Sequence, residues 1–137
     1  MASQTRYQHV GQIVGTNTLR VHPRTNAMSV ALDLLDSHTS GAPVIDDQGR
    51  YVGFISEVDL LKAARDTTAF EKLSVDEIMT RHLESVSPTT SIEEAIRAME
   101  QKHLILLPVV ENGVLLTTVS RHDLLRVILD VGLGIEQ

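Results

Sequence analysis

The chain has 137 residues, 42% of them hydrophobic, which is enough for one domain or two very small ones around a real core. It has no cysteine, which excludes a disulfide framework, thiol catalysis and cysteine-ligated metals, and fits a cytoplasmic location. A net charge of −6 argues against a nucleic-acid partner or an anionic membrane surface. No apolar stretch reaches the ~18 residues of a membrane-spanning helix, so we expect no membrane partner.

The first half of the chain predicts a helical entry, a strand, a helix, a hairpin and a second helix. The first strand ends at Val21, because Pro23 breaks it. "APVID" (42–46) predicts a buried strand, "DDQG" a hairpin turn and "YVGFI" the return strand. The final helix begins at Ser56. The helix between strand and hairpin has apolar residues at helical spacing: Ala27, Val30, Ala31, Leu34 and Leu35.

The second half repeats this order after "RDTTAFEKLS" (65–74), which we interpret as a solvated linker. A strand ends at Val86, "LLPVV" and "VLLTTV" predict a hairpin around "ENG", and a last helix begins at Ser120. Two helix starts carry the Ser-x-x-Glu pattern of a capping box: Ser74 with Glu77, and Ser91 with Glu94.

The two halves also match in sequence. A shift of 65 residues, which becomes 64 after one deletion, aligns "APVI" with "LPVV" and "SEVDLL" with "SRHDLL". We therefore predict a tandem duplication, with repeats at 8–64 and 75–130 and a linker at 65–74. The expected fold class is α+β, as two β-α-β-β-α repeats. Because each half is too small to be secure alone, we expect the halves to pack about a pseudo-twofold axis.

Each repeat ends in Ser-x-x-Asp at a predicted helix start, in "GFISEVD" (53–59) and "TTVSRHD" (117–123). One interpretation is a helix cap, with the serine at the N-cap and the aspartate three residues on. The other is a ligand site, because a carboxylate offers two acceptors to a vicinal diol and a helix start suits a phosphate. Thr117 stands in the second copy where the first has Gly53, and its side chain is expected to crowd a ligand pocket there. Both interpretations stay open from the residues alone.

The duplicated order, the Pro-Val strand in each half and the Ser-x-x-Asp endings resemble the CBS domain family, and the pair is similar to a CBS tandem, or Bateman module. The resemblance implies a regulatory sensor without catalysis that binds AMP, ADP, ATP or S-adenosylmethionine. In the family the aspartate binds the ribose hydroxyls and the serine lies on the phosphate side. The resemblance also implies a homodimer and an effector protein of unknown identity. The alternative is a ligand-free scaffold for dimerisation or docking.

The resemblance implies two clefts, each built from both repeats. One is expected to combine Ser120 and Asp123 with Thr16, Leu19, Thr39 and Ser40. The other is expected to combine Ser56 and Asp59 with Thr80, Glu84, Leu104 and Ile105. Adenine is expected near the backbone of Ala42 and Pro43, or of Leu107 and Pro108.

Charge guides the choice among these ligands. The family's basic residues before the proline are absent here, where Ser40, Gly41, Ile105 and Leu106 stand, which disfavours ATP against AMP or S-adenosylmethionine. Because Glu84 would repel an anion, we expect a phosphate to prefer the Asp123 cleft. We predict no metal site; the matching histidines, His38 and His103, are expected near helix C-termini, where an imidazolium suits the helix dipole.

Overall fold

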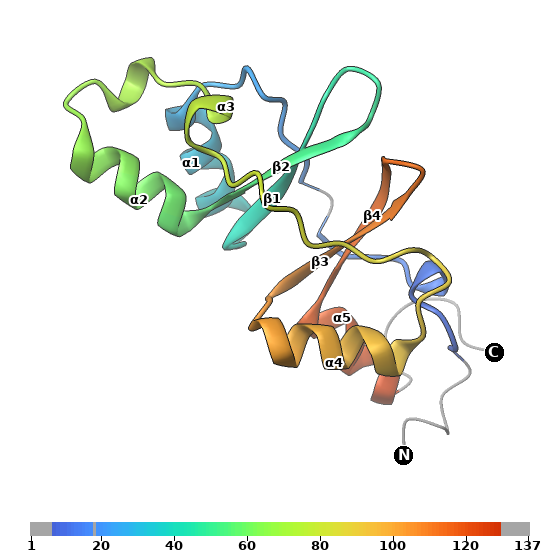
Figure 1. Ribbon diagram of the computed structural model, residues 1–137. Coiled ribbons are helices and arrows are strands. Elements are labelled where there is room, and N and C mark those ends of the chain that lie inside the picture. The colour runs from blue at the N-terminus through green and yellow to red at the C-terminus, as the bar shows by residue number, and fades with distance from the viewer. Residues whose placement is uncertain (1–6, 18, 130–137) are drawn as a thin grey trace. The chain divides into compact units, whose positions relative to one another are not determined.

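The computed structural model describes residues 7–17 and 19–129, so residue 130, at the end of the second predicted repeat, lies outside the described part (Figure 1). Helices and strands are mixed, as the α+β prediction requires. In chain order the elements are η2 (Val10–Gln12), α1 (Ala27–Ser37), β1 (Gly41–Ile45), β2 (Tyr51–Ser56), α2 (Glu57–Asp66), η3 (Phe70–Lys72), α3 (Val75–Ile78), α4 (Ile92–Lys102), β3 (Leu106–Glu111), β4 (Val114–Ser120) and α5 (Arg121–Leu129).

Each predicted hairpin forms a two-stranded antiparallel sheet, β1 with β2 and β3 with β4. The register pairs Gly41 with Ser56 and Leu106 with Ser120, so both serines stand at the open end of their hairpin, where the next helix begins. The register shifts after Val44 in one sheet and after Val109 in the other. The duplication inferred from the sequence therefore extends to these irregularities.

The short strands predicted to end at Val21 and Val86 are wrong as strands. Each is a single parallel bridge, Val21 to Val44 and Val86 to Val109. Val21 donates its amide to the Pro43 carbonyl at 3.0 Å and accepts from the Ile45 amide at 2.8 Å. A turn at Pro23 follows directly, and a proline cannot extend the ladder, so the extended segment stops after one bridge.

The chain divides into two compact units that do not coincide with the sequence repeats. The central unit is Leu19–Leu83, and the flanking unit takes the described residues of 1–18 together with those of 84–137. In the flanking unit, η2 docks on the start of α4, with the Val10 amide donating to the Thr90 carbonyl at 2.9 Å. In the central unit, α3 docks on the start of α1, with the Val75 amide donating to the Thr25 carbonyl at 2.8 Å. The entry segment of the first repeat, residues 8–17, thus belongs to the flanking unit, and that of the second repeat, residues 75–83, belongs to the central unit.

Both units have their own apolar core, and both cores are mainly aliphatic. Val10 of η2 and Val75 of α3 are fully buried in the unit that receives them, which explains why these short segments hold their places. The flanking core contains Tyr7, Val10, Ile13, Ile92, Ala95, Met99, Leu107, Val109, Val119, Leu124 and Val127. The central core contains Val21, Ala27, Val30, Leu34, Ala42, Val44, Ile55, Leu60, Val75 and Met79.

The stretch 65–74 is not a simple solvated linker. Phe70 and Leu73 pack against the central core, and the Leu73 carbonyl accepts the first amide of α1 from Ala27 at 2.8 Å. The charged residues that suggested solvation surround two apolar anchors, and burying those anchors is favourable. The segment is therefore packed against the central unit.

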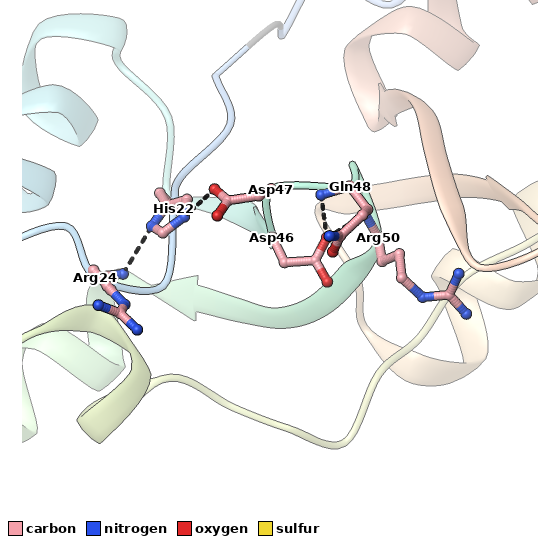
Figure 2. Close-up of polar contacts among 6 residues, drawn as sticks. All are labelled: His22, Arg24, Asp46, Asp47, Gln48 and Arg50. Carbon is pink, nitrogen blue, oxygen red and sulfur yellow. Dashed lines mark hydrogen bonds and ion pairs between the residues drawn. The ribbon is translucent and has the colours of Figure 1, made fainter.

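The hairpin turn between β1 and β2 is fastened to the segment that precedes α1 (Figure 2). Asp46 accepts hydrogen bonds from two turn amides, including that of Arg50 at 2.9 Å. The Arg24 amide donates to His22 Nδ1 at 3.1 Å, and His22 Nε2 contacts Asp47 Oδ1 at 2.8 Å. Because a backbone amide can only donate, Nδ1 accepts and Nε2 carries the proton given to Asp47.

None of the helices formed by residues 7–17 and 19–129 combines the length and the apolar character that crossing a membrane requires.

Candidate functional site

Ser56 and Asp59 form a reciprocal cap where β2 passes into α2. The Asp59 amide donates to Ser56 Oγ at 3.1 Å, and the Ser56 amide donates to Asp59 Oδ2 at 3.0 Å. Ser56 has extended backbone angles, as an N-cap residue requires. The cap interpretation of the motif is therefore confirmed here, and it leaves Asp59 Oδ1 without a cap partner.

Ser120 and Asp123 form the same cap where β4 passes into α5. The Asp123 amide donates to Ser120 Oγ at 3.0 Å, and the Ser120 amide donates to Asp123 Oδ2 at 2.9 Å. The remaining oxygen, Oδ1, is again outside the cap. Since capping uses one carboxylate oxygen, it does not by itself exclude a ligand at the other.

A threonine from the exchanged entry segment reaches each of these carboxylates. In the central unit, Thr80 Oγ1 lies 3.2 Å from Asp59 Oδ1 and 3.1 Å from Oδ2. In the flanking unit, Thr16 Oγ1 donates to Asp123 Oδ1 at 2.8 Å, and the Thr16 amide lies 3.4 Å from Oδ2. The structure thus brings together Thr80 with Asp59 and Thr16 with Asp123.

The two carboxylates differ in accessibility. Asp123 is completely buried, with 0% of its surface exposed. Asp59 is partly exposed and lines a cavity of about 320 Å³ between α2 and the following segment. The other lining residues are Lys62, Ala63, Asp66, Thr67, Leu73 and Ile78.

Lys62 was not among the predicted site residues. It lies three positions after Asp59, and residues three apart share one face of a helix, so this spacing could have identified it. It brings a cation to the cavity lined by Asp59. At the end of the same helix, Asp66 pairs with Arg65 at 2.8 Å, and this hydrogen bond raises the pKa of the Arg65 guanidinium above its ordinary value.

In both units the entry segment approaches the strand closely, and a glycine makes this possible. The glycine is on the strand in the central unit and on the entry segment in the flanking unit. A Cβ on Gly53 of β2 would lie 2.3 Å from Met79 Sδ. A Cβ on Gly15 of the other entry segment would lie 2.9 Å from Thr117 Oγ1. Thr117 is therefore tolerated at the position equivalent to Gly53, because the residue that faces it in the entry segment, Gly15, has no side chain. This exchange concerns packing between the strand and the entry segment, and the crowding of a ligand pocket by Thr117 stays a prediction.

Three residues predicted beside Asp123 belong to the central unit, whereas Asp123 belongs to the flanking unit. Thr39 Oγ1 donates to the Gly41 carbonyl at 3.2 Å. The Ser40 carbonyl accepts the first amide of α2, and Leu19 packs against the central core. Their grouping with Asp123 stays a prediction.

The corresponding residues of the flanking unit follow the same pattern. The Ile105 carbonyl accepts the Arg121 amide at 3.1 Å, and Leu104 packs against the flanking core. Both residues belong to a different unit from Asp59, so their grouping with that carboxylate also stays a prediction.

The residues predicted near adenine lie inside the sheets. Ala42 and Leu107 are buried in the cores of their units. The carbonyls of Pro43 and Pro108 accept the amides of Val21 and Val86, both at 3.0 Å. Adenine contacts at these four positions remain a prediction.

Glu84 does not present an unbalanced charge. Its Oε1 lies 2.7 Å from Lys102 Nζ, within the flanking unit. The reason for expecting a phosphate at Asp123 in preference to Asp59 therefore no longer holds. Arg121, the first residue of α5, lines a cavity of about 390 Å³ between α4 and α5 together with Glu100 and His103.

The two matching histidines lie at helix C-termini, as predicted, but their left-handed backbone conformation was not predicted. His38 and His103 end α1 and α4 as C-caps with φ of 53° and 54°, in the left-handed region. Across the described ranges, 7–17 and 19–129, no three His, Asp or Glu side chains assemble into a possible metal site.

Comparison with known proteins identifies both repeats. The family model of the CBS domain matches residues 10–66 and 75–130. A 17.7 kDa protein of Acidianus ambivalens, encoded in the bps2 3′ region, is 34% identical over 125 residues, which are 89% of this chain and 74% of that protein. The A-adding tRNA nucleotidyltransferase of Aquifex aeolicus is 26% identical, and there the match spans 87% of this chain but 14% of the enzyme.

A solved structure gives the same fold. The crystal structure of CBSX2 in complex with AMP superposes with a TM-score of 0.79 at 28% identity, covering 90% of this chain and 97% of that one. CBSX2 is a CBS-pair protein of Arabidopsis thaliana.

Proposed function

Since the chain belongs to the CBS domain family, we propose that it is a regulatory module that binds an adenosine-containing ligand at its Ser-x-x-Asp helix starts. The first candidate ligand is AMP, followed by ADP, ATP and S-adenosylmethionine. The module acts by changing the state of an effector protein or of its own assembly and performs no reaction itself. AMP leads because CBSX2, 28% identical, was crystallised with it.

One observation carries this proposal for the central unit. Asp59 is partly exposed and lines a cavity that also contains Lys62. Its carboxylate suits the two donors of a ribose diol, and the ammonium group of Lys62 suits a phosphate. A single cation suits a monophosphate better than a triphosphate.

Calorimetric titration of AMP, ADP, ATP and S-adenosylmethionine tests the proposal on wild type, Asp59→Asn and Ser56→Ala. Asp59→Asn removes the charge and should weaken binding by roughly 1.5–3 kcal/mol, the value of a charge-assisted hydrogen bond. Ser56→Ala removes the cap hydroxyl and keeps the carboxylate, so it should lower stability and change affinity less. If millimolar concentrations of none of these compounds bind wild type, the sensor function is wrong for them.

A ligand-free scaffold is the second candidate, and one observation favours it. Both carboxylates already accept hydrogen bonds from a serine amide and a threonine hydroxyl within their own unit. A carboxylate whose oxygens already accept hydrogen bonds from the protein can have a purely structural role and bind no ligand. In that case Asp59→Asn would reduce stability and leave the titrations of all four compounds unchanged.

We also propose that the chain forms a homodimer through its helices. Each unit exposes large apolar side chains on helices: Leu32 of α1 and Leu61 of α2 in one, Leu125 and Leu129 of α5 in the other. Large apolar side chains exposed on helices are available to an interaction surface. A second copy presents the same side chains and can bury them symmetrically.

A further inference from the structure

The two aspartates make different contacts with the threonine that reaches them. Thr16 gives Asp123 a short hydroxyl hydrogen bond of 2.8 Å to Oδ1, and its amide faces Oδ2 at 3.4 Å. The Thr80 hydroxyl is shared between both oxygens of Asp59 at 3.1 and 3.2 Å. The Thr80 amide is turned away and donates to the Phe54 carbonyl at 2.8 Å. Thr16 therefore covers its carboxylate with two donors, and Thr80 with one.

A ribose diol needs the acceptors that Thr16 occupies. The oxygen outside the Ser120 cap, Asp123 Oδ1, is the one that receives the Thr16 hydroxyl, and Asp123 has no exposed surface. A vicinal diol has two hydroxyl donors, so it can bind Asp123 Oδ1 only where it displaces the Thr16 hydroxyl. The Thr16 side chain is itself exposed, so its hydroxyl can leave Asp123 by rotating into solvent.

We propose that Thr16 competes with the ligand's ribose for Asp123, so that the Asp59 site fills first and the Asp123 site fills only when the Thr16–Asp123 hydrogen bond opens. This inference rests on the proposed function. It assigns Thr16 the role of a specificity-determining residue that makes two sites of the same motif unequal.

Gly15 explains why the contact is tight in the flanking unit. A Cβ at Gly15 would lie 2.2 Å from the Thr118 carbonyl oxygen, so only glycine lets the backbone approach β4 this closely. That approach brings the next residue, Thr16, against Asp123 with both its amide and its hydroxyl. In the central unit the glycine is on the strand instead, at Gly53, and the entry segment presents Met79 and Thr80.

AMP titration into Asp59→Asn, with and without Thr16→Val, isolates the Asp123 site. Valine keeps the branched shape of threonine and removes the donor. Removing this competitor should strengthen AMP binding to the Asp123 site by about tenfold or more, since charge-assisted hydrogen bonds have at least that effect on an equilibrium. Thr89→Val, at an exposed position of the same unit, is the matched control and should leave the affinity unchanged.

Amide NMR of the labelled wild-type chain gives a second measurement that does not depend on the variant folding. Increasing AMP should shift Ser56 and Asp59 to saturation before Ser120 and Asp123 respond. Simultaneous saturation of the two pairs, or weaker or unchanged AMP binding on Thr16→Val, overturns the inference while leaving AMP as a ligand. AMP binding to none of the variants nor to wild type overturns the inference and the proposed AMP sensor together.

Discussion

Gly53 of the strand lies close to Met79 of the entry segment in the central unit. A Cβ at Gly53 would lie 2.3 Å from Met79 Sδ and 3.0 Å from Met79 Cγ, so the methionine would have to repack. We expect Gly53→Ala to lower the free energy of unfolding by about 1–3 kcal/mol, as overpacking does. Urea denaturation measures the loss.

A double-mutant cycle provides the control for this prediction. In a Met79→Ala background the added methyl group has room, so Gly53→Ala should cost much less than in wild type. Equal costs in both backgrounds would show that the methionine is not what the glycine accommodates.

At the residue scale, the sequence was sufficient for contacts made within a few positions. Ser-x-x-Asp spacing offered a cap as one of two interpretations, because the serine hydroxyl and the amide three residues on are neighbours in any first helical turn. Contacts set by tertiary packing were not predictable from spacing. Thr16 and Asp123 are 107 positions apart, and their hydrogen bond depends on Gly15 lying against β4. The left-handed φ of His38 was also missed, because glycine or asparagine is more usual there.

Single elements were predictable where their end signals are local. Ser91 accepts the Glu94 amide at 3.0 Å and Glu94 Oε1 accepts the Ser91 amide at 3.1 Å, which is the capping box expected at the start of α4. The strands ending at Val21 and Val86 were overestimated. The proline that follows each segment shows where it must end, but it cannot show that only one bridge forms before that end.

The cap of α4 can be tested against a serine without a capping role. Ser91→Ala removes the acceptor of an orphan amide and should reduce stability by roughly 1 kcal/mol. Ser29→Ala, at an exposed position within α1, should be neutral or slightly stabilising, since alanine is the better helix former. Thermal unfolding of the two variants compares them directly, and an equal loss for both would argue against the cap.

The proposed dimer can be tested at the scale of the whole molecule. Leu61 of α2 is 68% exposed, and Leu61→Glu places a charge on the proposed interface. We expect wild type to have a dimer mass by light scattering at tens of micromolar and the variant to have a lower one. Leu116→Glu is the matched control, because Leu116 is 44% exposed but lies on β4. A monomer mass for wild type would contradict the dimer.

The exchange of entry segments predicts how fragments of the chain behave. The central unit is one continuous stretch, Leu19–Leu83, with its own core, so a fragment of these residues should fold. A fragment of 84–137 lacks Tyr7, Val10 and Ile13 of its core and should be largely unfolded alone. Adding a peptide of residues 1–18 should restore its structure in circular dichroism. Folding of 84–137 without the peptide would contradict this view.

The nested arrangement also sets an order of events during synthesis. The segment that carries Val10 leaves the ribosome before the central unit, but the residues that bury it, at the start of α4, come after the whole central unit. At about 5–20 residues per second, the intervening stretch takes roughly 3–13 s to translate. During that delay the central unit can fold, while the segment that carries Val10 remains with its apolar side chains in water. A segment made before the central unit is thus packed after it, and a chaperone that shields this segment would act during the interval.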